Sequence, residues 1–312
     1  MEKLRVIFMG TADFSVKSLA ALCNNAIGLD IVGVYTKPPK PSGRNYKIQK
    51  SDVHRFAEAE GIPVFHPKNF RSTDDVEKFR SLKPDVAVVS SYGLIIPQNL
   101  LEIPRYGFIN IHASLLPRWR GASPIRSAIL ADDKRAGITI MKMDPGVDTG
   151  DIISMKSVDI SAEMNHGELS NQLGDIGAAM IVETLNDLEG NLAKSYKQPE
   201  EGITYADKIT KDSCKINWND SAENISRCIR ALAPTPAAWA EIGDLRIKIF
   251  SAEIVDMNEH SQCGLICEGL IVACRTGSLK LTEVQPSGKN RMSGDDFMRG
   301  HRNLIGATFN VG

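Results

Sequence analysis

The chain has 312 residues, of which 42% are hydrophobic and 24% are charged, and its formal net charge at pH 7 is -1. This composition is ordinary for a globular protein, and the length favours two domains over one. The near-zero net charge excludes a chain that is basic throughout. Any contact with nucleic acid would therefore need a local cluster of Lys and Arg.

The N-terminus and the cysteines bear on the cellular compartment. The sequence begins Met-Glu-Lys-Leu-Arg, runs directly into a strand-like segment, and shows no signal-peptide pattern. No apolar run approaches the roughly 20 residues that cross a bilayer. The six cysteines include no CxxC pair; Cys263 and Cys267 fit a metal half-site or, as we favour, two small buried residues. We therefore expect a cytoplasmic protein with reduced thiols.

The first two-thirds of the chain alternates apolar strand-like runs with segments of helical spacing. Residues 4–9 form an apolar run closed by Gly10, and Asp13 then precedes a helical spacing that extends to Leu22. Further strands are predicted at 31–35, 63–65, 85–89, 108–112, 137–143 and 152–158, and further helices at 52–60, 74–82, 124–131 and 166–188. This alternation predicts a Rossmann-like α/β fold, with a parallel sheet covered by helices on both faces.

The first strand-to-helix turn excludes one common use of this fold. It reads Met-Gly-Thr-Ala-Asp-Phe at residues 9–14 and lacks the GxGxxG pattern that lets a pyrophosphate approach the backbone. The chain also has no Walker A sequence. A dinucleotide or ATP site is therefore not predicted.

The pattern changes after residue 189. Residues 190–205 are polar and weakly periodic and contain Gly190, Pro199 and Gly202, which is typical of a linker. Beyond them, a helix is predicted at 222–232, followed by short strands at 238–242, 245–255, 264–267, 270–274 and 279–284. Such closely spaced strands predict a small OB-like β-barrel. The predicted organisation is a Rossmann-like domain over 1–189, a linker over 190–205 and an OB-like domain over 206–312.

Three polar residues stand where an open α/β sheet places its active groups. Asn110 and His112 end the predicted strand 108–112 and share one face of it, and Asp148 lies in a Gly-rich loop between two later strands. A carboxylate orients and charges an imidazole, the imidazole moves protons, and an amide steadies an oxyanion. This set suits acyl transfer from a carbonyl donor to an amine. The other five histidines are interpreted as packed or surface residues.

Two further carboxylates, Asp144 and Asp151, flank the same loop. Pairs at this spacing also occur in metal sites and among the acid pairs of glycosidases. Because the other loop brings a histidine and an asparagine, we predict that no metal is bound here.

The residues around these side chains carry a family resemblance. Residues 110–121 read Asn-Ile-His-Ala-Ser-Leu-Leu-Pro-Arg-Trp-Arg-Gly, which resembles the signature of the 10-formyltetrahydrofolate-dependent formyltransferases. Ser-Leu-Leu-Pro alone is typical only of the superfamily. Longer runs resemble the members of this family that act on methionyl-tRNA, and they lie at 8–11, 35–44, 61–65, 91–97, 148–151 and, more weakly, 205–209 and 229–234. The resemblance therefore spans nearly the whole chain.

The resemblance implies a role for each of the three polar residues. His112 would exchange protons with the α-amino group of methionyl-tRNA, and Asp148 would hold its ring. Asn110 would donate an N–H to the oxyanion, a contact worth about 3 to 4 kcal/mol in comparable sites. No covalent enzyme intermediate is needed, because an amine is itself a nucleophile.

The resemblance also implies a site for the formyl donor, 10-formyltetrahydrofolate. Ser114, Leu115, Leu116 and Pro117 would line it, with the leucines against the pterin. The same leucines equally fit a strand-to-helix turn with ordinary core residues, and a pocket wall is also core.

A basic stretch follows the second predicted strand. It carries Lys37, Lys40, Arg44, Lys47 and Lys50. Its prolines and Ser-Gly pair predict an irregular loop, which by itself would usually be a solvated surface segment. Beside the family signature, we predict that Arg44, Lys47 and Lys50 contact the tRNA acceptor end. The family usually continues Gly-Arg-Gly-Lys-Lys, whereas residues 43–47 read Gly-Arg-Asn-Tyr-Lys, so individual contacts differ.

Three functions remain open at this point. The first is N-formylation of methionyl initiator tRNA by a cytoplasmic monomer that uses 10-formyltetrahydrofolate. The second is formylation of a small amine, or hydrolysis of formyl-folate, which would need neither the basic stretch nor the second domain. The third is a catalytically silent RNA-binding protein on the same fold, against which the intact Asn110, His112 and Asp148 argue.

Overall fold

The structure is a computed structural model that describes residues 3–24, 28–42, 47–256 and 262–310. The chain divides into two compact units, of which unit 1 comprises residues 1–124, 136–158 and 170–206 and unit 2 comprises residues 125–135, 159–169 and 207–312. The segment 190–205, predicted as a linker, thus lies within unit 1. Within the described ranges, no helix is both long enough and apolar enough to cross a membrane.

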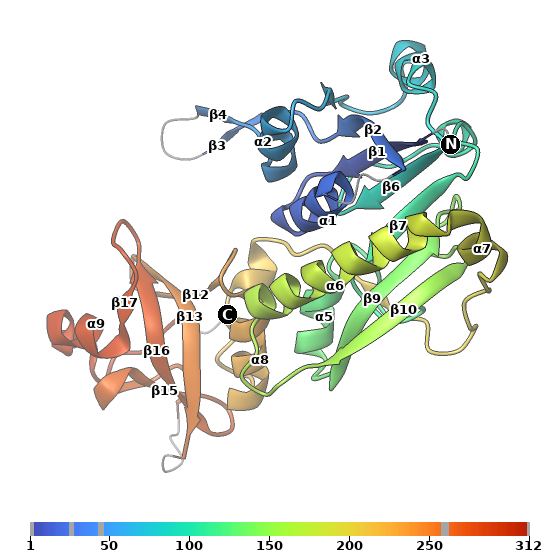
Figure 1. The fold of residues 1–312 in the computed structure, drawn as a ribbon. Coiled ribbons are helices and arrows are strands. Elements are labelled where there is room, and N and C mark those ends of the chain that lie inside the picture. Colours follow the sequence, from blue (N-terminus) through green and yellow to red (C-terminus); the bar gives the residue numbers. More distant parts are fainter. Residues whose placement is uncertain (1–2, 25–27, 43–46, 257–261, 311–312) are drawn as a thin grey trace. The chain divides into compact units, whose positions relative to one another are not determined.

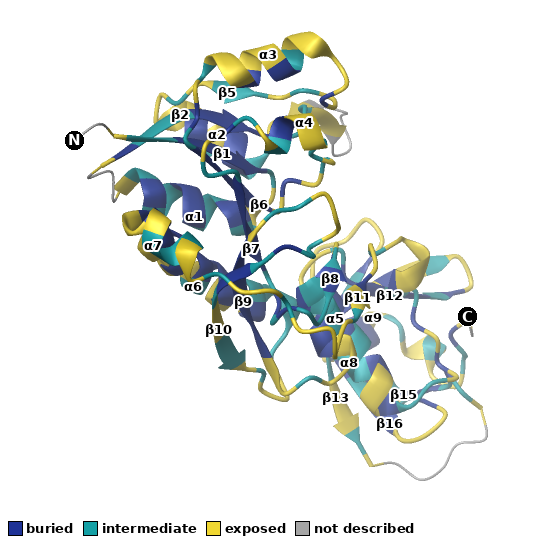
Figure 2. Ribbon diagram, turned by 90° about the vertical axis from the view of Figure 1, so that its right-hand side faces the viewer, coloured by how far each residue is buried: buried dark blue, intermediate teal, exposed yellow. Residues whose placement is uncertain are grey.

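Unit 1 is built on a seven-stranded sheet with the strand order β10-β9-β7-β6-β1-β2-β5 (Figure 1). Its strands are β1 (Leu4–Gly10), β2 (Leu29–Tyr35), β5 (Val64–Phe65), β6 (Val86–Ser90), β7 (Phe108–His112), β9 (Arg135–Lys142) and β10 (Ile152–Asp159). Each predicted strand is present, with ends that differ by no more than two residues. Figure 2 shows that β1, β6 and β7 are buried, as their continuous apolar runs predict.

The expected parallel pairing holds for part of this sheet and was wrong at β9. Strands β5, β2, β1, β6 and β7 pair in parallel, but β9 runs antiparallel to β7 and pairs Thr139 with His112. A parallel neighbour needs a crossover connection packed on the sheet. The connection from β7 to β9 contains the short helix α5 (Pro124–Leu130), and β9 returns antiparallel to β7.

Helices cover both faces of the parallel strands, and their sequences explain which side they bury. Helix α1 (Asp13–Asn24) buries Leu19 and Leu22, and α2 (Asp52–Ala59) buries Val53 and Ala57. The opposite face carries α3 (Thr73–Ser81) and α4 (Gln98–Leu101), whose apolar side chains join those of β1, β6 and β7 in one cluster. Spacings of three and four residues place these apolar positions on one side of each helix.

The long predicted helix 166–188 is present as α6 (His166–Asn186), which ends two residues earlier, and a short helix that was not predicted, α7 (Leu188–Ala193), follows it. The break follows from Asp187, whose side chain accepts a hydrogen bond from the N–H of Gly190 and so begins a new helix. Gly177 of α6 lets the helix approach Ile111 of β7 and Ile138 of β9, where a Cβ would lie 2.9 Å from the Ile111 side chain.

The basic stretch after β2 contains β3 (Lys40–Ser42) and β4 (Lys47–Gln49), which pair antiparallel. The prediction of an irregular loop was therefore wrong here. Proline is tolerated in a two-stranded ribbon because each strand has an outer edge where no N–H is needed. Two more short strands, β8 (Arg120–Gly121) and β11 (Tyr205–Ala206), form a separate parallel pair.

Unit 2 contains an antiparallel sheet of order β12-β13-β16-β15-β14, with β17 paired to β16. Its elements are α8 (Ala222–Leu232), β12 (Ala238–Ile242), β13 (Leu245–Val255), β14 (Ile266–Cys267), β15 (Ile271–Ala273), β16 (Ser278–Pro286), β17 (Met292–Ser293), α9 (Gly294–Gly300) and the 3-10 turns Asp212–Cys214, Glu268–Leu270 and Arg302–Leu304. The prediction of one helix followed by short strands is confirmed. Strand β17 and helix α9 were not predicted.

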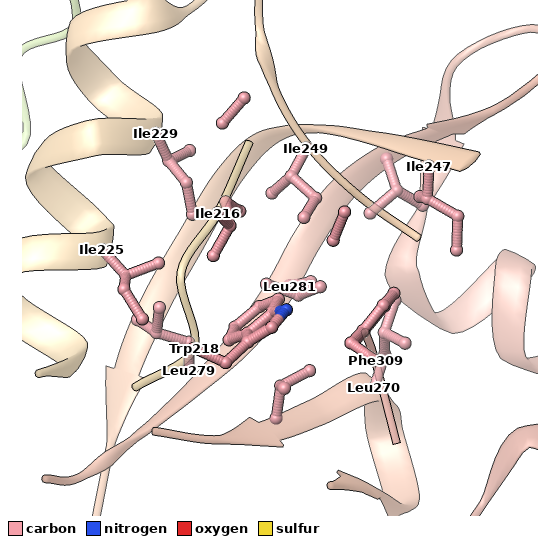
Figure 3. Close-up of a cluster of buried hydrophobic side chains, with 14 of the residues drawn as sticks. Ile216, Trp218, Ile225, Ile229, Ile247, Ile249, Leu270, Leu279, Leu281 and Phe309 are labelled. Atoms are coloured by element: carbon pink, nitrogen blue, oxygen red, sulfur yellow. The ribbon is translucent and has the colours of Figure 1, made fainter. Parts of the chain in front are cut away.

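A single apolar core fills unit 2. Trp218 is fully buried and stacks on Phe309, with ring centroids 5.2 Å apart. Figure 3 shows Ile225 and Ile229 projecting from α8 toward the sheet, where they join this core. The alternating burial of β12, with Ala238, Ala240 and Ile242 inward, explains why the sheet has one covered face.

Candidate active site

The end of β7 carries two of the three predicted catalytic residues. Asn110 and His112 are both buried, at 8% and 5% exposure, and they alternate with Ile109 and Ile111. Ile111 faces α6, so the two polar side chains lie on the opposite face of the sheet. Because β1, β2, β6 and β7 are parallel, their carboxyl ends meet at this edge.

The third residue, Asp148, lies in the loop between β9 and β10, and its carboxylate contacts both β7 residues. Asn110 Nδ2 donates to Asp148 Oδ1 at 3.2 Å. Asp148 Oδ2 accepts the backbone N–H of Gly121 at 2.8 Å and lies 3.6 Å from His112 Nδ1. The structure therefore brings the three predicted residues together.

The ring of His112 has an acceptor at each nitrogen. Nε2 lies 2.9 Å from the carbonyl oxygen of Trp119, and Nδ1 faces the Asp148 carboxylate. The ring of His112 is thus held between the carbonyl oxygen of Trp119 and the carboxylate of Asp148.

The orientations of the Asp148 carboxylate and the Trp119 carbonyl depend on backbone conformations that few residues other than glycine adopt. Trp119 has φ 61° and Asp148 has φ 51°, both in the left-handed region. The N–H of Trp119 donates to Thr204 Oγ1 at 2.9 Å, which holds the strained residue whose carbonyl meets His112. Gly121 has φ 115°, and a Cβ there would lie 2.7 Å from the carbonyl oxygen of Ala206, so both conformation and space require glycine.

The neighbouring Asp144 closes the Asp148 loop. Its Oδ1 accepts the N–H of Gly146 at 3.0 Å and the hydroxyl of Thr149 at 2.6 Å. Gly150 is required because a Cβ would overlap the carbonyl oxygen of Lys142. In the part of the chain that the structure describes, no three His, Cys, Asp or Glu side chains gather as ligands for a metal ion.

The turn predicted to bind folate is tied into the protein. Ser114 Oγ donates to the carbonyl of Arg118 at 2.6 Å, and the Ser114 carbonyl accepts from Thr139. Leu116 is 3% exposed and clusters with Met141 and Ile152. Leu115 and Pro117 are half-buried. The Leu115 side chain packs against Gly137, where a Cβ would lie 2.3 Å from it. Leu116 thus packs as a core residue of unit 1 whereas Leu115 is only half-buried, and the contact of both with folate stays a prediction.

The residues predicted to contact tRNA are only partly described. Arg44 and the side chain of Lys47 lie outside the described residues. Lys50 forms an exposed ion pair with Glu58, with Nζ 2.7 Å from both carboxylate oxygens. The hydrogen bond from Lys50 holds the pKa of Glu58 below its usual value.

Sequence reasoning missed the polar residues that support the site. Arg120 is 7% exposed and donates from Nε and Nη2 to Gln198 Oε1, at 3.1 and 2.7 Å. Gln198 Nε2 in turn donates to the carbonyl oxygens of Asp148 and Gly150, both at 2.8 Å. Arg120 stood within the family signature and could have been assigned a role. Gln198 stood in an apparent linker, and no sequence signal marked it.

The chain is similar to known formyl transferases over nearly its whole length. The family model "Formyl transferase" matches residues 2–185, and the model "Formyl transferase, C-terminal domain" matches residues 208–302. A methionyl-tRNA formyltransferase from Roseobacter denitrificans is 45% identical over 297 residues, which are 95% of this chain and 96% of that protein. One from Gluconobacter oxydans is 44% identical over 300 residues, covering 95% and 97% of the two chains.

Solved structures show the same fold. A variant of HypX from Aquifex aeolicus aligns with 97% of this chain at a TM-score of 0.65 and 15% identity, and this chain spans about half of HypX, 48%. HypX in complex with tetrahydrofolic acid aligns with 94% of this chain and 46% of its own, at a TM-score of 0.62 and 16% identity. The two family models and the two relatives at 44–45% identity show that the chain belongs to the formyl transferase family.

Proposed function

We propose that this protein transfers the formyl group of 10-formyltetrahydrofolate to the α-amino group of methionyl initiator tRNA, giving N-formylmethionyl-tRNA for translation initiation. The observation that carries the proposal is the contact of Asn110, His112 and Asp148 at the carboxyl end of β7. Identities of 44–45% to two methionyl-tRNA formyltransferases, over both units of the chain, support the choice of substrate.

The chemistry follows from the donors around Asp148. When the neutral amine attacks the formyl carbon, an N–C bond forms and negative charge develops on the formyl oxygen. Asn110 uses one N–H for Asp148 and has a second for this oxyanion. The positive charge of His112 stabilises the same oxygen.

His112 carries out both proton transfers that the reaction needs. The tetrahedral intermediate carries an ammonium proton that must leave and a folate nitrogen that must gain a proton. His112 gives a proton to the folate nitrogen and takes one from the ammonium group, after which the bond from carbon to the folate nitrogen breaks. Asp148 stays ionised and holds the ring in place. The products are a formylated amine and tetrahydrofolate.

Substrate binding is proposed for two surfaces. The turn Ser114, Leu115, Leu116 and Pro117 and the neighbouring apolar Val147, which is 62% exposed beside Asp148, would meet the folate. Arg44, Lys47 and Lys50 would meet phosphates of the tRNA acceptor end. We further propose that the protein acts in the cytoplasm as a monomer, with unit 2 as a second surface for tRNA.

The test is an activity assay with matched acceptors. Purified protein is incubated with 10-formyltetrahydrofolate and, separately, with methionyl initiator tRNA, an amino sugar nucleotide, glycinamide ribonucleotide or buffer alone. Formylation of methionyl-tRNA with at least about 10³-fold higher kcat/KM than of either small amine is expected, since only tRNA uses both units. Preferential formylation of a small amine, or hydrolysis of formyl-folate at the same rate without acceptor, would contradict the proposal.

A further inference from the structure

The side chain of Gln198 joins the two loops that build the site. On one side it donates to the carbonyl oxygens of Asp148 and Gly150, and on the other it accepts from the buried guanidinium of Arg120. Arg120 has only donors and the two carbonyls are only acceptors, so the orientation of the amide is fixed. Among the twenty side chains, only an amide of this length offers both kinds of group across this gap.

The segment that carries Gln198 is fastened at both of its ends. Tyr196 exchanges two backbone hydrogen bonds with Ile152, at 2.8 and 3.0 Å. At the other end, Thr204 accepts the backbone N–H of Arg120 at 2.9 Å, and β11 pairs with β8. Gln198 is thus held between the start of β10, which follows the Asp148 loop, and the strand that follows Trp119.

Asp148 needs such support because its backbone is in a region that few residues adopt. With φ 51°, its carboxylate is aimed by the peptide groups on either side of it. The side-chain hydrogen bonds that Asp144 and Thr149 form with described residues stay within the loop. Gln198 supplies that link, because its two hydrogen bonds fix the carbonyl of Asp148 itself and that of Gly150.

We propose that Gln198 is a positioning residue for catalysis, which acts by holding the Asp148 carboxylate against His112 and Asn110. This inference rests on the proposed formyl transfer. Gln198 is additional to Asn110, His112 and Asp148, the three residues proposed to act on the reacting atoms. It lies in segment 190–205, which the sequence predicted to be a linker. Because the effect passes through Asp148, it concerns the rate of the bound complex rather than the affinity for either substrate.

The variant Gln198→Leu keeps the size of the side chain and removes all four hydrogen bonds. We expect kcat to fall about 10²-fold, the cost of misplacing a catalytic group by about 1 Å, with KM for folate and for tRNA changed by less than about threefold. Gln198→Glu keeps the acceptor for Arg120 but sets a carboxylate against two carbonyl oxygens, so it should lose at least as much. The control Gln98→Leu removes a glutamine that bonds only Glu102 on the surface of α4, and its kcat should equal that of the parent.

A double-mutant comparison separates positioning from general damage. In an Asp148→Asn background, measured in single turnovers, Gln198→Leu should cost no more than about twofold, because the group it positions is already impaired. Thermal unfolding of each variant is recorded, and Gln198→Asn, which is polar but one methylene too short, serves if Gln198→Leu does not fold. A kcat within about twofold of the parent, a loss confined to KM, or the same fold-loss in both backgrounds would overturn the proposal. Absence of formyl transfer by the parent protein would instead overturn the proposed function.

Discussion

The Asp148 carboxylate of unit 1 and the Trp218 indole of unit 2 are both held by residues distant in the chain, but by different forces. Asp148 meets Asn110, His112 and the N–H of Gly121 through polar contacts of 2.8 to 3.6 Å. Trp218 is fully buried among apolar side chains, and its Nε1 has no hydrogen-bond partner among the described residues.

The difference shows what each region tolerates. Hydrogen bonds depend on direction and length, so the site depends on strained backbone at Trp119 and Asp148 and on a glycine at 121. Apolar contact is non-directional and scales with the area removed from water, so the core of unit 2 depends on volume and patterning. Substitutions of the catalytic side chains should therefore change the rate, and substitutions in the apolar core of unit 2 should change stability.

The largest effect is expected at the site itself. Replacing His112 by Ala, or Asp148 by Ala, removes the proton carrier or the group that holds it, and kcat should fall at least about 10³-fold while tRNA still binds. Formyl transfer is measured in single turnovers and tRNA binding by filter retention. The exposed His66→Ala is the control. Turnover above about 10% of the parent would remove these residues from their roles.

A substitution in the core of unit 2 is expected to lower stability. Trp218→Ala leaves a cavity against Phe309 and should lower the free energy of unfolding by about 3 to 5 kcal/mol. Trp218→Phe should lose much less, because the indole N–H makes no hydrogen bond that would be forfeited. Denaturant unfolding of both variants measures this, and equal losses would show that the indole contributes something other than packing.

A titratable group in unit 2 tests whether its stability is purely apolar. Burial, and secondarily the charge of Arg126, lowers the pKa of His166 from 6.5 to about 4. Between pH 6.5 and pH 4, His166 is protonated in the unfolded chain but stays neutral in the folded protein. Stability therefore falls as the solution is acidified. The loss at pH 5 should be about 1 to 2 kcal/mol. Unfolding curves at pH 7 and pH 5 should show this loss in the parent and not in His166→Gln.

The smallest effect is expected in the basic stretch of residues 37–50, at Arg44, which lies outside the described residues. Arg44→Ala should raise KM for tRNA about tenfold and reduce the slope of log affinity against log salt by about 0.9, as one lost phosphate contact does. KM for folate should not change. Arg71→Ala, which removes another exposed arginine, is the control. Equal loss of tRNA and folate binding would contradict the assignment of Arg44.

The amino-acid sequence predicted individual elements well and long-range support poorly. Helix α8 and strands β7, β12 and β13 have their predicted bounds, because hydrophobic period and capping are local properties. The antiparallel return of β9 was missed, because an apolar run predicts a buried strand but not the direction in which that strand pairs. The paired strands β3 and β4 were missed because a Pro-rich basic stretch resembles a loop when read alone.

The sequence by itself determined which chemistry this protein carries: Asn110, His112 and Asp148 are identifiable from their residue types and their places at strand ends. Only the tertiary structure decided how they are supported. Gln198, Thr204 and Arg120 reach the site because a weakly patterned segment folds back on β8 and β10. Periodicity reports which face a residue occupies within its own element, whereas hydrogen bonds between segments about 50 to 85 residues apart leave no periodic trace.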